Sequence, residues 1–372
     1  MWQASTQGVF IVNRVYNFGA GPAALPESVL KIAQAELLNW HDTGMSILEI
    51  GHRTPEFMNA VAEKTETDLR TLLQIPQNYH ILFLAGGGQS QFGMVPLNLL
   101  ALNSQHEADY VDTGIWSRKA ITEAQRYGKI HIAASSADNH YTDLPQTWHC
   151  NDNAAYLHYT SNETIGGLAF HTPPRTTAPL VADMTSSLLS EPLDISRFGL
   201  IYAGAQKNIS AAGLTIVIIR DDLLGHALPF TPTLWMYKTH HEARSLFNTP
   251  PVFAWYLAGL VFDWIKQQGG LAALAAFNTQ KAQTLYQLID DSQGFYKNPI
   301  HPRARSKMNI PFFLKTPELE RFFLQEAQRH ALANLKGHKL SGGIRASIYN
   351  AVTQEAANTL AHFMQDFMQR HG

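Results

Sequence analysis

The chain has 372 residues, of which 45% are hydrophobic and 16% are charged, and its formal net charge is −2. This length is sufficient for one large domain and a smaller one, and the composition is typical of a globular protein rather than a disordered one. The near-neutral charge gives no reason to expect a nucleic-acid or membrane-surface partner.

The single cysteine, Cys150, excludes an internal disulfide and a cysteine-only metal cluster. None of the 17 histidines lies in a HExxH or comparable zinc-binding pattern, so we expect no metal site. No apolar run approaches the roughly 20 residues of a membrane helix, and residues 8–12 are too few for a signal-peptide core. We therefore expect a cytoplasmic protein that does not bind membranes. Residues 1–16 are interpreted as an N-terminal extension without an assigned role.

Strand-like and helix-like segments alternate along the chain, as they do in parallel α/β proteins. Residues 26–40 are predicted to form a helix with proline in its first turn. A buried strand at 81–85 runs into Gly86-Gly87-Gly88 and an apolar helix at 92–100. Most of the strands run into Gly, Ser, Thr or Asn, and ligands bind beyond the carboxyl ends of strands in open α/β sheets. Further strands are predicted at 108–112, 155–159, 180–183, 200–204 and 214–220.

A change of pattern near Gly269-Gly270, after an apolar helix at 252–265, predicts a domain boundary. We expect a large domain at 17–268 and a small α+β domain at 269–372. The small domain is predicted to contain helices at 271–289 and 318–330, strands at 307–314 and 344–351, and a closing amphipathic helix.

Lys207 follows the predicted strand at 200–204 and is surrounded by small residues. Burial there would lower the pKa of its amine and make it nucleophilic. A loop lysine taken alone is more often simply solvated, so this interpretation depends on its neighbours. Asp183 ends another strand, where a carboxylate suits the pyridine nitrogen of pyridoxal 5′-phosphate (PLP), although it could equally cap the next turn.

Three more strand ends carry groups that fit this cofactor. Gly86–Gly88 could direct backbone N–H groups at a phosphate where a helix begins, with Ser186, Ser187 and Thr249 adding contacts. Trp116 could stack on the ring, and Thr164 could hydrogen-bond a cofactor oxygen. Each element alone is more often an ordinary turn or core residue. Their order at five successive strand ends, however, is that of a PLP aminotransferase.

Five segments of the chain resemble the phosphoserine aminotransferase family, and they occur in the family's order from Asn17 to the C-terminus. The resemblance implies the fold-type-I architecture of PLP-dependent transferases, with a mostly parallel seven-stranded sheet in the large domain and a small α+β C-terminal domain. The matching segments are Asn17–Ala23, Gly51–Arg53, Ala203–Asn208, Phe247–Pro251 and Gly343–Ala351.

The same resemblance implies a homodimer that transfers an amino group between L-glutamate and 3-phosphohydroxypyruvate, giving O-phospho-L-serine and 2-oxoglutarate. This reaction belongs to serine biosynthesis, and the use of a second phosphorylated substrate, in pyridoxine synthesis, stays open. It implies that Lys207 is the Schiff-base lysine and Asp183 the partner of the ring nitrogen. The other implied cofactor residues are Trp116 on the ring, Thr164 and Gln206 at its oxygens, Gly88 and Gln89 at the phosphate, and Asn248 and Thr249 from the second subunit.

For the substrate, Arg345 matches the family's α-carboxylate clamp, and His52, Arg53 and His338 match phosphate-binding residues that come from both subunits. Arginine suits such sites because its planar fork pairs with an anion at two points. Lys339 stands where the family usually has arginine, which keeps the charge but loses the two-point geometry. Apart from the resemblance, His52 and Arg53 would be interpreted as a solvated helix start and Arg345 as a strand-edge residue.

Three alternatives stay open. An aminotransferase or lyase of the same fold could act on a different acidic substrate. A nucleotide-binding oxidoreductase could use Gly86–Gly88, but the chain lacks the acidic ribose partner and Lys207 would then be unexplained. A binding protein without catalytic activity could also be built on this scaffold.

Overall fold

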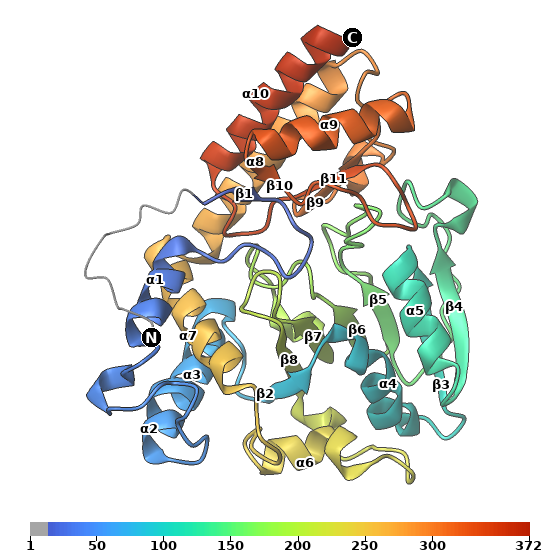
Figure 1. The fold of residues 1–372 in the computed structure, drawn as a ribbon. Coiled ribbons are helices and arrows are strands. Elements are labelled where there is room, and N and C mark those ends of the chain that lie inside the picture. Colours follow the sequence, from blue (N-terminus) through green and yellow to red (C-terminus); the bar gives the residue numbers. More distant parts are fainter. Residues whose placement is uncertain (1–13) are drawn as a thin grey trace.

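The computed structural model describes residues 14–372, so most of the expected N-terminal extension lies outside the described residues. Seven strands form one sheet in the order β2-β8-β7-β6-β5-β3-β4 (Figure 1). Of these seven, only β8 runs against its neighbours, being antiparallel to both β2 and β7. The predicted mostly parallel seven-stranded sheet is confirmed. Its strands are β2 (Tyr79–Gly86), β3 (Glu107–Asp112), β4 (Lys129–Ser135), β5 (Leu157–Thr160), β6 (Leu180–Asp183), β7 (Leu200–Gly204) and β8 (Gly213–Arg220).

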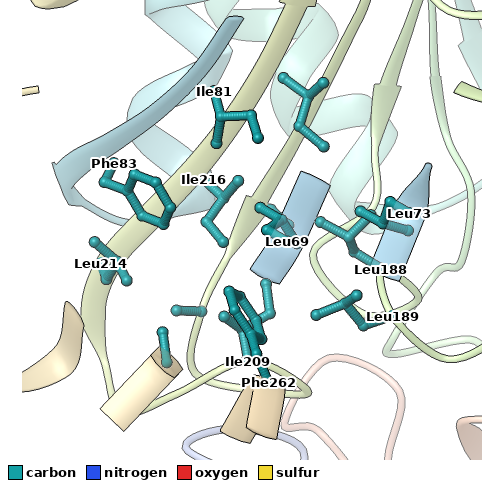
Figure 2. Close-up of a cluster of buried hydrophobic side chains, with 14 of the residues drawn as sticks. Leu69, Leu73, Ile81, Phe83, Leu188, Leu189, Ile209, Leu214, Ile216 and Phe262 are labelled. Atoms are coloured by element: carbon teal, nitrogen blue, oxygen red, sulfur yellow. The ribbon is translucent and has the colours of Figure 1, made fainter. Parts of the chain in front are cut away.

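Helices cover both faces of this sheet (Figure 1). The part of the chain that contains this sheet has the helices α1 (Glu27–Glu36), α2 (Pro55–Phe57), α3 (Lys64–Leu73), α4 (Gly88–Leu99), α5 (Ile115–Ala124), α6 (Tyr237–Glu242) and α7 (Val252–Gln267). Because successive strand residues point to opposite faces, β2 contributes to two cores. Ile81 and Phe83 pack with Leu69 of α3 and Phe262 of α7 (Figure 2), whereas Leu82 packs on the other face with residues of α4 and α5. A sheet buried on both faces produces the near-continuous apolar runs that the sequence shows.

The C-terminal part of the chain has a core of its own at one end of the molecule (Figure 1). It contains α8 (Gly270–Asp291), α9 (Pro317–Arg329), α10 (Gln354–His371) and the short strands β9 (Asn309–Phe312), β10 (Leu332–Ala333) and β11 (Ile344–Ser347). Threonine side chains cap two of these helices: Thr316 accepts from the N–H of Leu319, and Thr353 from that of Ala356. β9 and β11 form an antiparallel pair.

The N-terminal segment also joins this C-terminal core. β1 (Tyr16–Asn17) pairs in parallel with β10, and Phe18 is completely buried among the C-terminal side chains. The proposed domain boundaries at residues 17, 268 and 269 stay a prediction. The start of the predicted large domain, including Phe18, in fact packs into the core of the C-terminal part.

A buried polar seam joins the two cores through α8. The Asn278 amide donates to the carbonyl of Ser190 (2.9 Å) and to the side chain of Asn350 (2.8 Å). The backbone N–H of Asn350 in turn donates to Asn208, the neighbour of Lys207 (3.1 Å). One turn further along α8, Lys281 is 2% exposed, and burial lowers its pKa to about 7. Its amine donates to the backbone carbonyls of residues 348, 349 and 352 at 3.1, 2.9 and 2.8 Å.

This seam explains one departure from the predicted elements. The strand expected at 344–351 ends at Ser347 because the next carbonyls face Lys281 instead of a neighbouring strand. The helix expected at 26–40 similarly ends at Glu36, and a short 3₁₀ turn follows at Trp40–Asp42, where His41 has φ 49°.

Candidate active site

The carboxyl ends of β2, β3, β5, β6 and β7 meet at one edge of the sheet, and the predicted residues follow them. Gly88 begins α4 directly after β2, and Trp116 lies in the first turn of α5 after β3. Thr164, Asp183 and Lys207 follow or end β5, β6 and β7. Parallel strands bring their ends to the same edge, which is where ligands bind in such sheets.

A cavity of about 370 Å³ lies at this edge and is lined by residues from both parts of the chain. Its volume falls in the range of small-molecule sites, roughly 300–1,000 Å³. Nine of the predicted residues that line it are called the cavity group: Gly88, Gln89, Trp116, Thr164, Asp183, Gln206, Lys207, His338 and Arg345. Ser186, also predicted, lines the cavity as well.

Lys207 is 8% exposed, and its amine donates a 2.5 Å hydrogen bond to the hydroxyl of Thr164. Burial lowers the pKa of Lys207 to about 8, with the nearby charge of Asp183 opposing that shift. A buried lysine whose amine is readily deprotonated is a suitable nucleophile and proton carrier. The alternative of a solvated loop lysine does not describe Lys207.

Asp183 is 6% exposed and lines the same cavity. One of its oxygens accepts from the N–H of Thr185 at 2.9 Å, so the residue also caps the turn after β6. Burial raises the pKa of Asp183, whereas the Thr185 bonds and the charge of Lys207 lower it. The turn cap is therefore present, and the role of Asp183 at a cofactor ring nitrogen stays a prediction for a carboxylate that lines the cavity.

The N-terminus of α4 opens into the cavity. Gly87 and Gly88 line it, and among the described residues no side chain caps the first turn of this helix. A side chain at Gly204 would come within 3.0 Å of the Gly88 nitrogen, so glycine there permits the backbones of β7 and α4 to lie close together. Uncapped N–H groups at a helix start are well suited to a phosphate.

Arg345 brings a cation to the cavity from β11 of the C-terminal part. One guanidinium nitrogen donates to the carbonyl of Thr164 at 3.3 Å, while Nε is buried and has no hydrogen-bond partner among residues 14–372. Burial lowers the pKa of Arg345. His338 lies on the same side, and burial followed by the charges of Arg345, Lys119 and Lys339 lowers its pKa. The cavity thus has a basic side that suits an anionic ligand.

Several predicted residues, Ser187 and Lys339 among them, do not line this cavity in the single chain, and four of them lie together elsewhere. We call them the outer group: His52, Arg53, Asn248 and Thr249. They belong to two segments that contact each other, because the Arg53 guanidinium donates to the carbonyl of Leu246 at 3.0 Å. Lys339 is exposed and also does not line the cavity, although its neighbour His338 does.

Sequence reasoning missed several residues that shape the site. Ala20 and Gly21 line the cavity from the N-terminal segment, and Ala23 donates its N–H to the carbonyl of Gln206 at 2.9 Å. Asn162 also lines it and donates to Ser186 at 2.8 Å. These residues lie within or beside motifs that the sequence displayed, but their roles depend on contacts between distant segments.

The cavity satisfies the requirements of PLP. It contains an uncapped helix start for a phosphate, a carboxylate in Asp183, a buried amine in Lys207 and a half-buried indole in Trp116. The indole nitrogen of Trp116 is buried without a hydrogen-bond partner in the described part of the chain. No group of three or more His, Cys, Asp or Glu in that part is arranged to hold a metal ion, and no helix within residues 14–372 has the length and apolar character needed to cross a membrane.

Comparison with known proteins agrees with this geometry. The model of the family described as aminotransferase class-V matches residues 15–360. A phosphoserine aminotransferase of Hahella chejuensis is 55% identical over 364 residues, which is 97% of this chain and 100% of the relative. One from Pseudomonas syringae pv. tomato is 54% identical over 362 residues, covering 96% and 99% of the two chains.

Solved structures give the same result. The phosphoserine aminotransferase of Bacillus circulans subsp. alkalophilus superposes with a TM-score of 0.93 at 45% identity, covering 96% of this chain and 99% of that one. The PLP-bound phosphoserine aminotransferase of Trichomonas vaginalis superposes with a TM-score of 0.90 at 40% identity, covering 95% and 100%.

Proposed function

This chain belongs to the class-V aminotransferase family of PLP-dependent enzymes, and on that premise we propose that it is a phosphoserine aminotransferase. It would exchange an amino group between L-glutamate and 3-phosphohydroxypyruvate, giving O-phospho-L-serine and 2-oxoglutarate in the cytoplasm. The observation that carries the proposal is the convergence of Lys207, Asp183 and Arg345 on one cavity. The names of relatives at 53–55% identity support the choice of substrates.

When bound, PLP supplies an electron sink for the substrate's α-carbon. The residues suited to hold it are Lys207 for the covalent bond, Asp183 at the ring nitrogen, Trp116 against the ring, and Gly88 and Gln89 at the phosphate. Thr164 and Gln206 are suited to its oxygens. With the cofactor bound, Asp183 would keep a proton on the ring nitrogen, because a buried carboxylate favours a neighbouring cation.

Lys207 moves the proton of the substrate. With the cofactor and an amino donor bound, the free amine of Lys207 would take the proton from the substrate's α-carbon as a general base and would give it back as a general acid. The Thr164 hydroxyl, which accepts from the amine at 2.5 Å, holds Lys207 over the cavity. A pKa of about 8 suits both roles near neutral pH.

Arg345 orients the substrate by pairing its two-pronged guanidinium with the α-carboxylate. Its buried Nε, which lacks a partner in residues 14–372, is the donor available for this contact. His338 lies nearby for the phosphate, or for the γ-carboxylate of glutamate.

We propose that the outer group completes the site of a second subunit in a homodimer, with His52 and Arg53 at the substrate's phosphate and Asn248 and Thr249 at the cofactor. His52, Arg53, Asn248 and Thr249 are polar or basic, lie together around the Arg53–Leu246 contact and do not reach the cavity of their own chain. The same phosphate-binding residues would accept a second phosphorylated substrate, such as the one in pyridoxine synthesis. An aminotransferase or lyase acting on a different acid stays the alternative, because Lys339 replaces the arginine usual in the family.

A half-reaction series tests the proposal. Purified holoenzyme is mixed with glutamate, aspartate or alanine, and loss of the cofactor's visible absorbance is followed; the product is then mixed with 3-phosphohydroxypyruvate or with hydroxypyruvate. We expect conversion by glutamate and recovery by the phosphorylated keto acid at much lower concentration. Equal recovery by both keto acids would contradict a phosphoserine substrate, and no conversion by any amino donor would contradict aminotransfer.

A further inference from the structure

Glu163 is a buried acid beside the cavity whose role no motif assigns. Its side chain is 1% exposed and lies between the loop after β5 and the start of α5. One carboxylate oxygen accepts from the backbone N–H of Trp116 at 3.0 Å, and the other from that of Ser117 at 2.9 Å. These are two of the four N–H groups that a helix leaves without partners at its N-terminus.

Glu163 therefore caps α5 from a distant segment. The residue at the cap position is Gly114, which has no side chain. Within residues 14–372, the Ser117 hydroxyl bonds to backbone groups of residues 113 and 114 and to Glu163. A side chain at Gly114 would have its Cβ 2.7 Å from the Glu163 carboxyl carbon. The glycine is thus required for the close approach of the carboxylate.

The two ends of this contact belong to two walls of the cavity. On one side, Trp116 lines the cavity from the first turn of α5. On the other, Thr164 directly follows Glu163, accepts from Lys207 and, through its carbonyl, from Arg345. A displacement of Glu163 would accordingly change the distance between the indole and the residues that hold the amine.

We propose that Glu163 is a positioning residue that fixes the Trp116 ring relative to Thr164 and so sets how tightly, and in which orientation, the flat cofactor binds. The proposal rests on the assignment of PLP to this cavity, but on no particular substrate. The helix dipole stabilises a carboxylate at this end of α5. Burial raises the pKa of Glu163, and the N–H groups of Ser117 and Trp116 lower it.

The contrast with α4 supports this role. Both helices begin at the same edge of the sheet. The N-terminal N–H groups of α4 are open to the cavity, whereas two of those of α5 donate to the carboxylate of Glu163. Of these two helices, α4 therefore has the N-terminus that is available to a phosphate, and α5 places the indole of Trp116 at the cavity.

The test compares Glu163→Gln with Glu123→Gln in the apo-protein. Glu123 lies on the same helix, bonds Tyr127 at 2.9 Å and does not line the cavity, so it controls for the substitution itself. A glutamine side chain has one acceptor oxygen and an NH₂ group that cannot accept from the second N–H. We expect the dissociation constant for PLP to rise about tenfold in Glu163→Gln, because one charge-assisted bond is lost. We also expect a changed circular dichroism of the bound cofactor at saturation.

Glu123→Gln should alter neither quantity. If Glu163→Gln binds PLP with wild-type affinity and wild-type circular dichroism, the proposal is wrong, even when the melting temperature falls. These readouts need no substrate, so failure of the phosphoserine assignment would appear separately in the wild-type half-reactions.

A second variant covers the case in which Glu163→Gln does not fold. Gly114→Ala leaves the carboxylate intact but pushes it away through the new Cβ. We expect the same weakening of PLP binding, and an unchanged affinity in folded Gly114→Ala protein would overturn the proposal. In the double variant Glu163→Ala/Gly114→Ala the contact between the new Cβ and the carboxylate is absent, while the backbone strain of alanine at φ 157° remains, so the part of the effect that comes from the contact should be non-additive.

Discussion

The cavity group and the outer group contain similar side chains, yet the chain places them differently. The cavity group comes mainly from the ends of parallel strands, whose positions the sheet fixes, with His338 and Arg345 added from the C-terminal part. The outer group lies on two loops that contact each other and not the cavity. On our proposal, one chain supplies the groups for bond making, and a second chain supplies part of the groups for substrate recognition. Changes in the two groups should have different consequences.

The largest effect is expected from Lys207→Ala. Without the amine, proton transfer at the α-carbon loses its acid–base group, and the half-reaction with glutamate should slow by about 10⁴-fold. Stopped-flow absorbance measures the rate, and borohydride should no longer attach the cofactor. Lys266→Ala, a change to an exposed lysine of α7, serves as the control. A rate within tenfold of wild type would refute the role of Lys207.

Asp183→Ala should be the next most severe change in the cavity group. Loss of the buried carboxylate removes the stabilisation of the ring cation, and the half-reaction should slow by about 100- to 1,000-fold while cofactor binding remains measurable. The matched control is Asp109→Asn, because Asp109 is also a buried carboxylate at the sheet but does not line the cavity. A near-normal rate in Asp183→Ala would show that Asp183 is only a turn cap.

The outer group is best tested with mixed subunits. Arg53→Ala should lower kcat/KM for the phosphorylated keto acid by about 100-fold, since a charge-assisted pair is lost. If Arg53 serves the partner's site, the Arg53→Ala protein can be unfolded and refolded together with an equal amount of Lys207→Ala protein. About half of the dimers are then hybrids with one intact site each, so roughly a quarter of wild-type activity should return. Absence of recovery would place Arg53 and Lys207 in the same subunit's site.

A smaller, graded effect is expected from pH. Only the neutral amine of Lys207 attacks an aldehyde, so capture of PLP by the apo-protein should accelerate about tenfold per pH unit below 8 and level off above it. Stopped-flow absorbance between pH 6 and 10 gives the profile. Since the charge of Asp183 raises the pKa of Lys207, Asp183→Asn should move the midpoint to lower pH. A midpoint near that of an exposed lysine would contradict the burial argument.

The smallest expected change is that of Lys339→Arg. Arginine would restore two-point pairing at the exposed position beside His338, and KM for the phosphorylated keto acid should fall by about two- to fivefold with little change in kcat. Lys336→Arg, at another exposed lysine nearby, is the control. An unchanged KM would mean that residue 339 does not contact the phosphate.

The strand ends could be predicted because their physical signal is local. β6 and β7 are buried on both faces, and their apolar runs end where predicted, at Asp183 and Gly204. That placement alone brings Asp183 and Lys207 to one edge. β4 was not predicted, because Lys129 and His131 interrupt its apolar pattern at the edge of the sheet.

The capping of α5 could not be predicted for a different reason. Glu163 directly precedes the predicted residue Thr164, but its partners are backbone N–H groups of residues 116 and 117, and backbone donors have no sequence signature. Gly114 by itself indicates only a turn. The separation of the outer group from the cavity was likewise invisible, because it depends on where two loops lie in space.

The polar seam through α8 has a consequence for how the molecule unfolds. Asn278 and Asn350 are buried, and they donate hydrogen bonds to Ser190 and Asn208 of the part that contains the large sheet. These donors would lose their partners if the two parts separated. A fragment beginning at residue 269 would expose these amides beside an apolar surface and lose Phe18 from its core. We therefore expect such a fragment to aggregate when expressed alone, and the intact chain to unfold in a single cooperative transition rather than in two steps.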